Sequence, residues 1–304
     1  CDPTPEIRQL EGADKWKADK APTLLELAAM AHENTVKKPR RYMDFLAKTL
    51  QSWEGLAKSI NEGALAPTPK VPRTRFNRVL SQHRVFEGVT FPLEDIKSIK
   101  NRVGGTVNDA MLAICAGALR RYLQEKDELP EEPLISMCPI SVRDPGVKGG
   151  AGNQVVSMSV SLHTDIADPG KRLEAICAST RNAKEATNAL DAKSLIEMAD
   201  FIPTQLSALG ARVAAENGLA NFMAPVVNTV ITNVPGVQHP IYSNGAQLVR
   251  GWGLGPCTDG NGLFHSIGSY CGEVYIGVTC CRTMMPDPAR YAECLNESFK
   301  ELRG

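Results

Sequence analysis

The stretch GGTVNDAMLAICAGALRR, residues 104–121, constrains the fold more than any other part of the sequence. From Ala110 to Leu119 every residue is apolar or glycine, so a helix here has no polar side to turn toward water. Such a helix is buried on all sides, in the interior of a large domain or in a membrane. A membrane span needs about twice this length. The sequence therefore predicts a helix that other elements of a globular domain enclose.

Polar residues stand at the start of this helix, where the chain enters the core. Thr106 and Asp109 fit the capping-box pattern T-x-x-D, in which the threonine caps the helix and the acid lies at its positive end. The pattern leaves Asn108 unexplained, because asparagine lowers helix propensity and has no part in the cap. The spacing alone leaves two interpretations of Asn108 and Asp109 open. They close the end of a helix, or they face a site that reacts.

A β-sheet is predicted by alternation in NQVVSMSVSLH, residues 153–163. Apolar side chains at 156, 158, 160 and 162 alternate with serines at 157, 159 and 161, which indicates one buried face. Further strands are expected within 84–91, 133–143, 226–236, 245–253, 262–270 and 273–281, and helices within 92–103, 169–190, 192–217 and 288–302. Because strands and helices interleave without a strict βαβ rhythm, we expect an α/β (α+β) fold, a mixed β-sheet packed with helices.

Residues 1–75 are predicted to form a helical linker segment. Thr23 and Glu26 fit a capping box for a short helix, and residues 42–61 carry one apolar stripe at helical spacing. The proline-rich end of this segment is unsuited to helix and marks the boundary of a domain at 76–304. Basic groups flank the 42–61 helix, which packs on its own domain or lies on an anionic membrane surface. Because no methionine precedes Met30, we also expect residues upstream of Cys1 to be missing.

Composition and cysteine spacing exclude several classes of function. The 304 residues contain 34 basic and 34 acidic side chains, so no overall field favours nucleic acid as a partner. The nine cysteines show no CxxC pair and no cysteine/histidine cluster at zinc spacing, so we expect neither a disulfide framework nor a metal site. No secretory signal opens the chain. These features predict a cytoplasmic protein without a bound metal.

Three further polar residues lie in or at the ends of expected strands. Asn233 precedes a Pro-Gly turn in ITNVPG, which is either turn chemistry or an amide at the edge of a cleft. Arg143 ends a strand, where it meets solvent or binds an anionic group. His265, like the other four histidines, is isolated in the sequence, so we expect a packed residue and not a base. The residues by themselves therefore offer no self-contained catalytic group.

Five segments in a fixed order carry a resemblance to a known family. They are GGTVNDAMLAICAGALRRYL, PLISMCPISVR, NTVITNVPG, IYSNGAQL and GLFHSIGSYCGEVYIGV. Over residues 76–304 the chain resembles the C-terminal region of bacterial wax ester synthase/acyl-CoA:diacylglycerol acyltransferases. The resemblance implies a chloramphenicol-acetyltransferase-like acyltransferase domain, one of two similar mixed-sheet domains with a channel between them.

The family's catalytic motif, HHxxxDG, belongs to its N-terminal domain and does not occur in this chain. A segment similar to CDPTPE follows that motif in the family, so the chain is expected to begin just past its catalytic histidine. In the family this histidine acts as the general base that takes a proton from an alcohol. The resemblance therefore implies that this chain holds no catalytic residue and is inactive until its N-terminal domain completes it.

The resemblance also suggests roles for residues of this chain. Asn108 and Asp109 fall in the family's ND motif, and Asn233, Val234 and Pro235 fall in its NVP motif, both of which border the active site. The resemblance favours Asn108 as a hydrogen-bond donor that faces the channel and Asp109 as the helix cap. A DFGWG motif of more distant relatives is absent, and its nearest string, RGWGLG, is given no role.

The activity that the resemblance implies is transfer of a fatty acyl group from acyl-CoA to a long-chain alcohol or diacylglycerol, which makes wax esters or triacylglycerol. Acyl-CoA is then a co-substrate, with no further cofactor, and Arg143 is a further candidate for lining its site. The expected partners are the N-terminal domain and a lipid surface, at the periphery of the inner membrane or of lipid bodies. Two alternatives stay open: a non-catalytic lipid-surface or interaction module built on the 42–61 helix, and a condensation-type acyltransferase with a carrier-protein donor.

Overall fold

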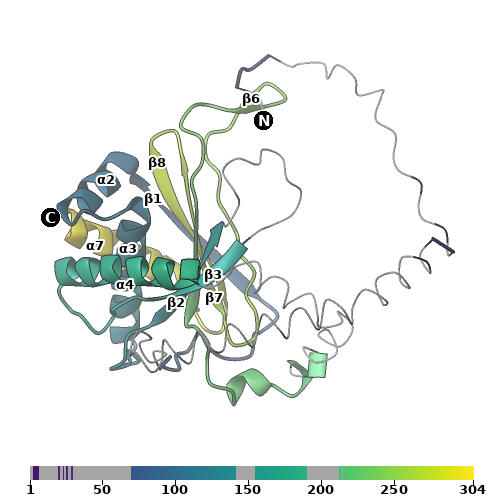
Figure 1. Ribbon diagram of the computed structural model, residues 1–304, viewed down its shortest axis with the longest axis vertical. Coiled ribbons are helices and arrows are strands. Elements are labelled where there is room, and N and C mark those ends of the chain that lie inside the picture. Colours follow the sequence, from purple (N-terminus) through teal and green to yellow (C-terminus); the bar gives the residue numbers. More distant parts are fainter. Residues whose placement is uncertain are drawn as a thin grey trace.

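A computed structural model describes residues 70–141, 155–189, 212–213 and 215–304, together with isolated positions among the first 29 residues. These residues form a six-stranded sheet with helices on one face (Figure 1). Along the sheet the strand order is β1-β8-β7-β4-β2-β3. The strands are β1 (Arg84–Pro92), β2 (Ile135–Ser141), β3 (Val155–Ser161), β4 (Thr229–Val234), β7 (Leu263–Tyr270) and β8 (Glu273–Cys281), and the helices are α2 (Leu93–Arg102), α3 (Val107–Gln124), α4 (Pro169–Ala189) and α7 (Pro288–Arg303).

Both directions of strand pairing occur in this sheet. Strands β1, β8 and β7 are antiparallel neighbours, as are β2 and β3, whereas β4 runs parallel to both β7 and β2. Strand β3 shows the expected alternation, because Val156, Met158 and Val160 are buried and the serines at 157 and 159 are exposed. Helix α4 packs against β3. The expected mixed sheet packed with helices is confirmed.

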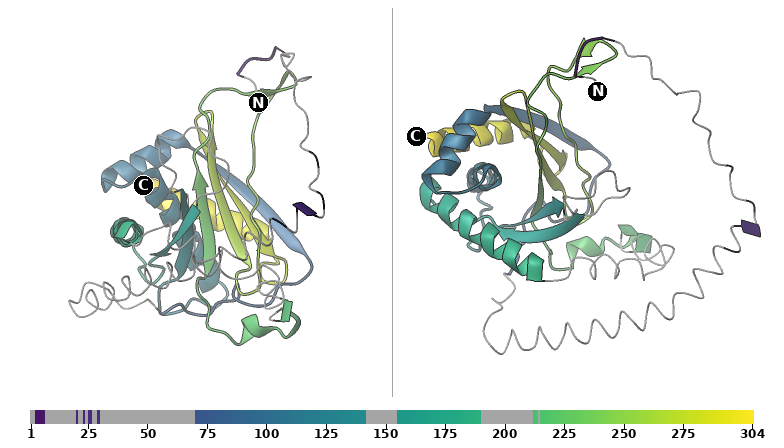
Figure 2. Two further views of the ribbon diagram at one scale, coloured as in Figure 1. Left: turned by 45° about the vertical axis from the view of Figure 1, so that its right-hand side comes forward. Right: turned by 45° about the horizontal axis from the view of Figure 1, so that its top comes forward.

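Helix α3 lies at the centre of the core. The right-hand view of Figure 2 shows it end-on, between the sheet and the helices α2, α4 and α7 that it contacts. Every residue from Ala110 to Leu119 is buried, as the apolar run predicts. Gly117 permits the close approach of α7, because a Cβ at this position would lie 2.1 Å from Ser298 Oγ. A helix without a polar face is stable only in such a place, since any exposed side would return apolar area to water.

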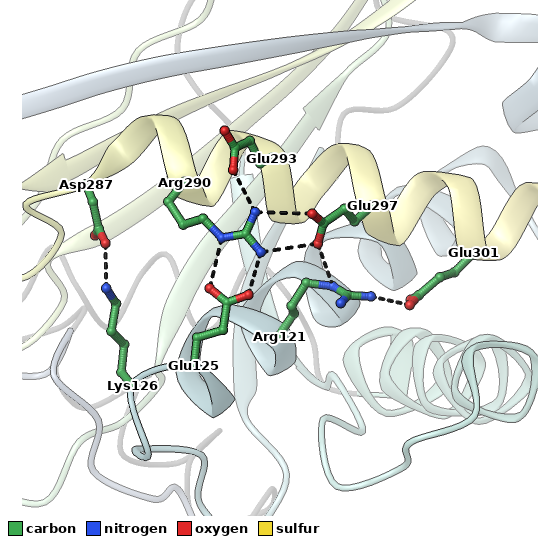
Figure 3. Close-up of polar contacts among 8 residues, drawn as sticks. All are labelled: Arg121, Glu125, Lys126, Asp287, Arg290, Glu293, Glu297 and Glu301. Atoms are coloured by element: carbon green, nitrogen blue, oxygen red, sulfur yellow. Dashed lines mark hydrogen bonds and ion pairs between the residues drawn. The ribbon is translucent and has the colours of Figure 1, made fainter.

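Charged residues at the edge of this contact also join α3 to α7 (Figure 3). Arg290 on α7 donates to both carboxylate oxygens of Glu125, at 2.9 and 2.5 Å, and contacts Glu293 and Glu297. Arg121 on α3 contacts Glu297 as well, at 3.0 Å. Each pair is partly exposed and stabilises the fold by at most about 1 kcal/mol. The shared partners fix how the two helices face each other.

Residues 245–253, expected to form a strand of the main sheet, do not join it. Within them only Ala246–Gln247 (β6) is a strand, and it pairs with Tyr242–Ser243 (β5) in a separate two-stranded sheet. The strand expectation for 245–253 is therefore wrong beyond these two residues.

Glycines explain the path that this segment takes instead. A Cβ on Gly253 would lie 1.9 Å from Ser266 Oγ of β7, and a Cβ on Gly277 of β8 would lie 2.5 Å from the carbonyl oxygen of Gly253. Likewise a Cβ on Gly88 of β1 would lie 2.4 Å from the ring of Trp252. The segment therefore crosses β7, β8 and β1 on the sheet face opposite the helices. Gly253, together with Gly88 and Gly277 of the strands beneath it, allows this close packing. A sequence pattern does not distinguish such glycines from those that interrupt a strand.

Several expectations concern residues outside the described ranges. The helix at 42–61, most of the helix at 192–217 and Arg143 belong to this group. Near the start, Thr23 and Glu26 form the expected capping box, with Thr23 N donating to Glu26 Oε2 at 2.7 Å and Glu26 N to Thr23 Oγ1 at 3.3 Å. Within the part of the chain that the structure describes, no helix is both long and apolar enough to cross a membrane.

Candidate active site

The first turn of α3 is held by the side chains of Thr106 and Asp109. Thr106 is the N-cap residue, and its hydroxyl oxygen accepts a hydrogen bond from Asp109 N at 3.3 Å. In return, the backbone N–H and the hydroxyl of Thr106 each donate to Asp109 Oδ2 at 2.8 Å. The expected capping box is confirmed. A cap of this kind stabilises a helix by about 1 kcal/mol.

The second oxygen of the Asp109 carboxylate is bound by α4. Thr180 donates its hydroxyl to Asp109 Oδ1 at 2.7 Å, and both residues are buried. Cys177 lies one turn earlier on α4, where burial, followed by the neighbouring Asp109 carboxylate, raises the pKa of its thiol to about 11. Both oxygens of Asp109 are therefore engaged inside the fold, between α3 and α4.

Asn108 is adjacent to Asp109 in the sequence but contacts a different element. Its Oδ1 accepts a hydrogen bond from Asn233 Nδ2 at 3.3 Å. Asn233 belongs to β4, 125 residues further along the chain, and both asparagine side chains are half-buried. The structure thus brings together the asparagines of the ND and NVP motifs, which the sequence alone left as separate candidates.

This pair of amides offers N–H donors to a third group. The contact uses one N–H of Asn233, and among the described residues the Nδ2 of Asn108 has no hydrogen-bond partner. A neutral amide carries these donors without depending on pH, and the N-terminus of α3 adds partial positive charge beside Asn108. Donors fixed in this way stabilise negative charge that develops on an oxygen atom during a reaction.

Val234 is the last residue of β4, and Pro235 then leads the chain out of the sheet. Both are exposed, Val234 by 68%. The following Gly236 lies against β7, because a Cβ there would lie 2.0 Å from the carbonyl oxygen of Ser269, and its N–H donates to Ser269 Oγ at 3.1 Å. The NVPG sequence therefore ends β4 one residue after the asparagine, at Val234, whose side chain is open at the surface.

His265 lies in β7 beneath the helices and is fully buried. Its Nε2 shares a hydrogen bond with the Tyr291 hydroxyl at 2.8 Å, and its Nδ1 shares one with Thr229 Oγ1 at 3.1 Å. Burial lowers the pKa of the imidazole from its usual 6.5 to about 4. With both ring nitrogens engaged and no contact with solvent, His265 is the packed residue that the sequence predicts.

Sequence reasoning missed Thr180 and Cys177 of α4, which contact the start of α3. Neither lies in a motif, and a threonine within a helical stretch gives no sign of a partner 71 residues earlier. Gly105 is an indirect sign, because a Cβ there would lie 2.8 Å from Cys177 Sγ. The position of Arg143, the other expected lining residue, falls outside the described ranges.

The arrangement of sheet and helices is that of the chloramphenicol-acetyltransferase-like, condensation-type fold. The epimerization domain from the third module of tyrocidine synthetase B has a similar structure, with a TM-score of 0.50 over 82% of this chain and 55% of that chain. The two sequences are 12% identical, so the likeness concerns the fold alone.

Family models give a closer assignment. The model of the WS/DGAT C-terminal domain matches residues 151–303, and the model of the wax ester synthase/diacylglycerol acyltransferase catalytic domain matches residues 1–111. The chain belongs to the wax ester synthase/diacylglycerol acyltransferase family. The resemblance seen in the sequence is thereby confirmed.

Individual relatives agree with this assignment. A putative diacylglycerol O-acyltransferase of Mycobacterium tuberculosis is 33% identical over 277 residues, which cover 88% of this chain and 60% of the relative. The solved structure of the wax ester synthase/diacylglycerol acyltransferase from Marinobacter aquaeolei VT8 is 30% identical, with a TM-score of 0.58 over 82% of this chain and 55% of that one. The chain thus spans little more than half the length of these relatives.

Proposed function

We propose that this chain supplies the C-terminal part of an acyl-CoA-dependent O-acyltransferase, which transfers a fatty acyl group to a long-chain alcohol or diacylglycerol. The observation that carries the proposal is the contact of Asn108 with Asn233, which joins the ND and NVP motifs into one pair of amide donors. Membership of the family supports the same activity. Acyl-CoA is the co-substrate, and the thioester is already activated, so transfer needs no further cofactor.

The reaction is a direct transfer from sulfur to oxygen. The alcohol oxygen attacks the thioester carbonyl carbon while a general base removes the hydroxyl proton; the new C–O bond forms, the C–S bond breaks, and the proton passes to the CoA thiolate. A positioned base contributes about 10²–10⁴ in rate. His265 does not fit this role, because it is buried with both nitrogens engaged. We propose that the base belongs to an HHxxxDG motif outside these residues.

Asn108 and Asn233 act on the carbonyl oxygen in this proposal. Negative charge develops on that oxygen as the alcohol attacks, and fixed N–H donors in a partly dry site stabilise it more than water does. The half-buried position of both amides suits this role, since they are shielded from bulk water yet reachable. Asp109 contributes indirectly, as the residue that fixes the turn on which Asn108 stands.

A second domain is the proposed partner on the channel side. The segment after Asn233 exposes large apolar side chains, with Val234, Val249 and Leu254 between 68% and 83% exposed. Exposed apolar side chains in number are typical of a surface that another domain or a lipid covers. The cytoplasmic location and contact with a lipid surface remain predictions, as does the alternative of a lipid-surface module, which depends on the helix at 42–61.

The test measures CoA release from an acyl-CoA with hexadecanol or diacylglycerol as acceptor. The chain alone should be inactive, and the same chain joined to a segment with HHxxxDG should form esters. In the joined protein, Asn108→Ala should lower kcat by about 10²–10³-fold, as loss of an oxyanion donor does. Asn101→Ala, at an exposed asparagine of α2, is the matched control.

Two results would contradict the proposal. Ester formation by the chain alone would mean that the base lies within these residues, and His265 would need testing first. An unchanged kcat in the Asn108→Ala protein would mean that the amide pair takes no part in the reaction.

A further inference from the structure

We propose that Thr180 is a positioning residue for this acyltransferase. Its hydroxyl binds Asp109 and thereby holds Asn108 in the orientation that the reaction needs. The inference rests on the proposed function, and it adds a residue of α4 to a site otherwise built from α3 and β4. Thr180 itself lies within the core and touches no substrate, being 2% exposed.

The contacts form a continuous path from α4 to the amide pair. The Thr180 hydroxyl donates to Asp109 Oδ1 at 2.7 Å, while Asp109 Oδ2 accepts from both donors of Thr106 at 2.8 Å. Asp109 follows Asn108 directly, and Asn108 in turn meets Asn233 at 3.3 Å. A carboxylate held from two directions cannot rotate without losing a buried hydrogen bond, so the turn that carries Asn108 is fixed relative to α4.

The packing around this path leaves little room for adjustment. Cys177 lies three residues before Thr180 on the same face of α4, and its sulfur fills the space beside Gly105, where a Cβ would lie 2.8 Å away. The start of α3 thus packs against Cys177 of α4 and is hydrogen-bonded to Thr180 of the same helix. A capping box alone orients Asp109 within its own helix, whereas the bond from Thr180 also ties the Asp109 carboxylate to α4.

The proposal predicts a specific pattern of kinetic effects in the joined, active protein. Thr180→Val keeps the shape and removes the hydroxyl, and it should lower kcat about 10- to 100-fold, because small displacements of a reacting constellation are costly in rate. KM for acyl-CoA should stay within twofold. Thr180→Ser restores the donor and should restore kcat, which a purely structural role of the methyl group would not predict.

A matched control separates positioning from loss of stability. Thr164 is also fully buried, and its hydroxyl oxygen accepts a hydrogen bond from Leu134 N at 3.0 Å, away from the amide pair. Thr164→Val should lower the urea midpoint to a degree similar to that of Thr180→Val but leave kcat within twofold. Should Thr180→Val fail to fold, Thr180→Ala tests the same bond.

The outcomes distinguish this inference from the proposed function. A kcat within twofold of wild type in whichever Thr180 variant folds would overturn the positioning role. If the wild-type joined protein forms no ester with any donor, the proposed function fails. The side-chain amide NMR signals of Asn108 and Asn233 then test whether Thr180 still positions the amide pair. They should shift in Thr180→Val but not in Thr180→Ser, and unchanged signals in both would overturn the inference.

Discussion

A buried histidine and a pair of half-buried asparagines differ in how many of their hydrogen-bonding groups the fold itself uses. Both ring nitrogens of His265 share hydrogen bonds with side chains of its own core, whereas the amides of Asn108 and Asn233 keep N–H groups that, in our proposal, bind the carbonyl oxygen of the substrate. Residue type alone would have ranked them in the reverse order, because histidine is the commoner base. The burial of His265 and the engagement of both its ring nitrogens argue against it as the base.

The burial of His265 predicts acid sensitivity of the fold. Its pKa is about 4 in the folded chain and 6.5 when exposed, so between these values the unfolded state binds more protons and folding stability falls as pH falls. The loss from pH 7 to pH 4 should reach about 3 kcal/mol from this residue. Urea unfolding at half-unit pH steps should show a shallower pH dependence for His265→Gln than for wild type.

The same substitution at His239, which is exposed, provides the comparison. Equal pH dependence in wild type and His265→Gln would mean that the imidazole is not buried in its neutral form.

At the level of elements, the contact between α3 and α7 combines a close apolar approach with the ion pairs of Figure 3. The apolar part depends on a small residue at Gly117, and the ionic part on Arg290, which three carboxylates share. The apolar part is the more sensitive, because packed interiors do not yield to an extra methyl group, whereas partly exposed ion pairs contribute little each.

Gly117→Ala should therefore lower the free energy of unfolding by about 1–3 kcal/mol. In an ordinary helix the same change would raise stability by about 1 kcal/mol, so the sign of the effect is diagnostic. Ser298→Ala should be nearly neutral alone, since its hydroxyl has no hydrogen-bond partner among the described residues. Combined with Gly117→Ala, Ser298→Ala should recover part of the lost stability. A Gly117→Ala protein more stable than wild type would show that α3 and α7 lie further apart than described.

At the scale of the whole molecule, one sheet separates two different surfaces. Its helix-covered face holds the core, and the opposite face carries the glycine-rich segment around Trp252. Every buried apolar residue of the described core lies between Phe76 and Leu302. Residues just before this core are tied to it, because Asn228 Nδ2 donates to the carbonyl oxygen of Pro72 at 2.6 Å.

A chain shortened to residues 70–304 should accordingly fold on its own, with the far-UV circular dichroism and urea midpoint of the sheet and helices retained. A chain that begins at residue 76 should be less stable, because it loses the Pro72 contact and the Thr74 partner of Asn77. A shortened chain that fails to fold would show that residues 1–69 belong to the core. The predicted division at 75 and 76 would then be wrong.

The local features of this fold could be predicted from the sequence. The enclosed helix α3, its capping box at Thr106 and Asp109, and the one-sided strand β3 all follow from patterns within about 20 residues, because helix and strand periods place neighbours on defined faces. The absence of a polar face from Ala110 to Leu119 also predicted that other elements enclose α3, and the interleaving of strand and helix patterns predicted a mixed sheet packed with helices.

What the tertiary structure alone decided concerns residues far apart in the chain. The contact of Asn108 with Asn233, the bond from Thr180 to Asp109 and the course of residues 245–253 across the sheet depend on how distant segments pack. The sequence does not show whether a given glycine or threonine faces solvent, backbone or a carboxylate. Its role is set by the group that packing brings against it, and a local pattern contains no information about that group.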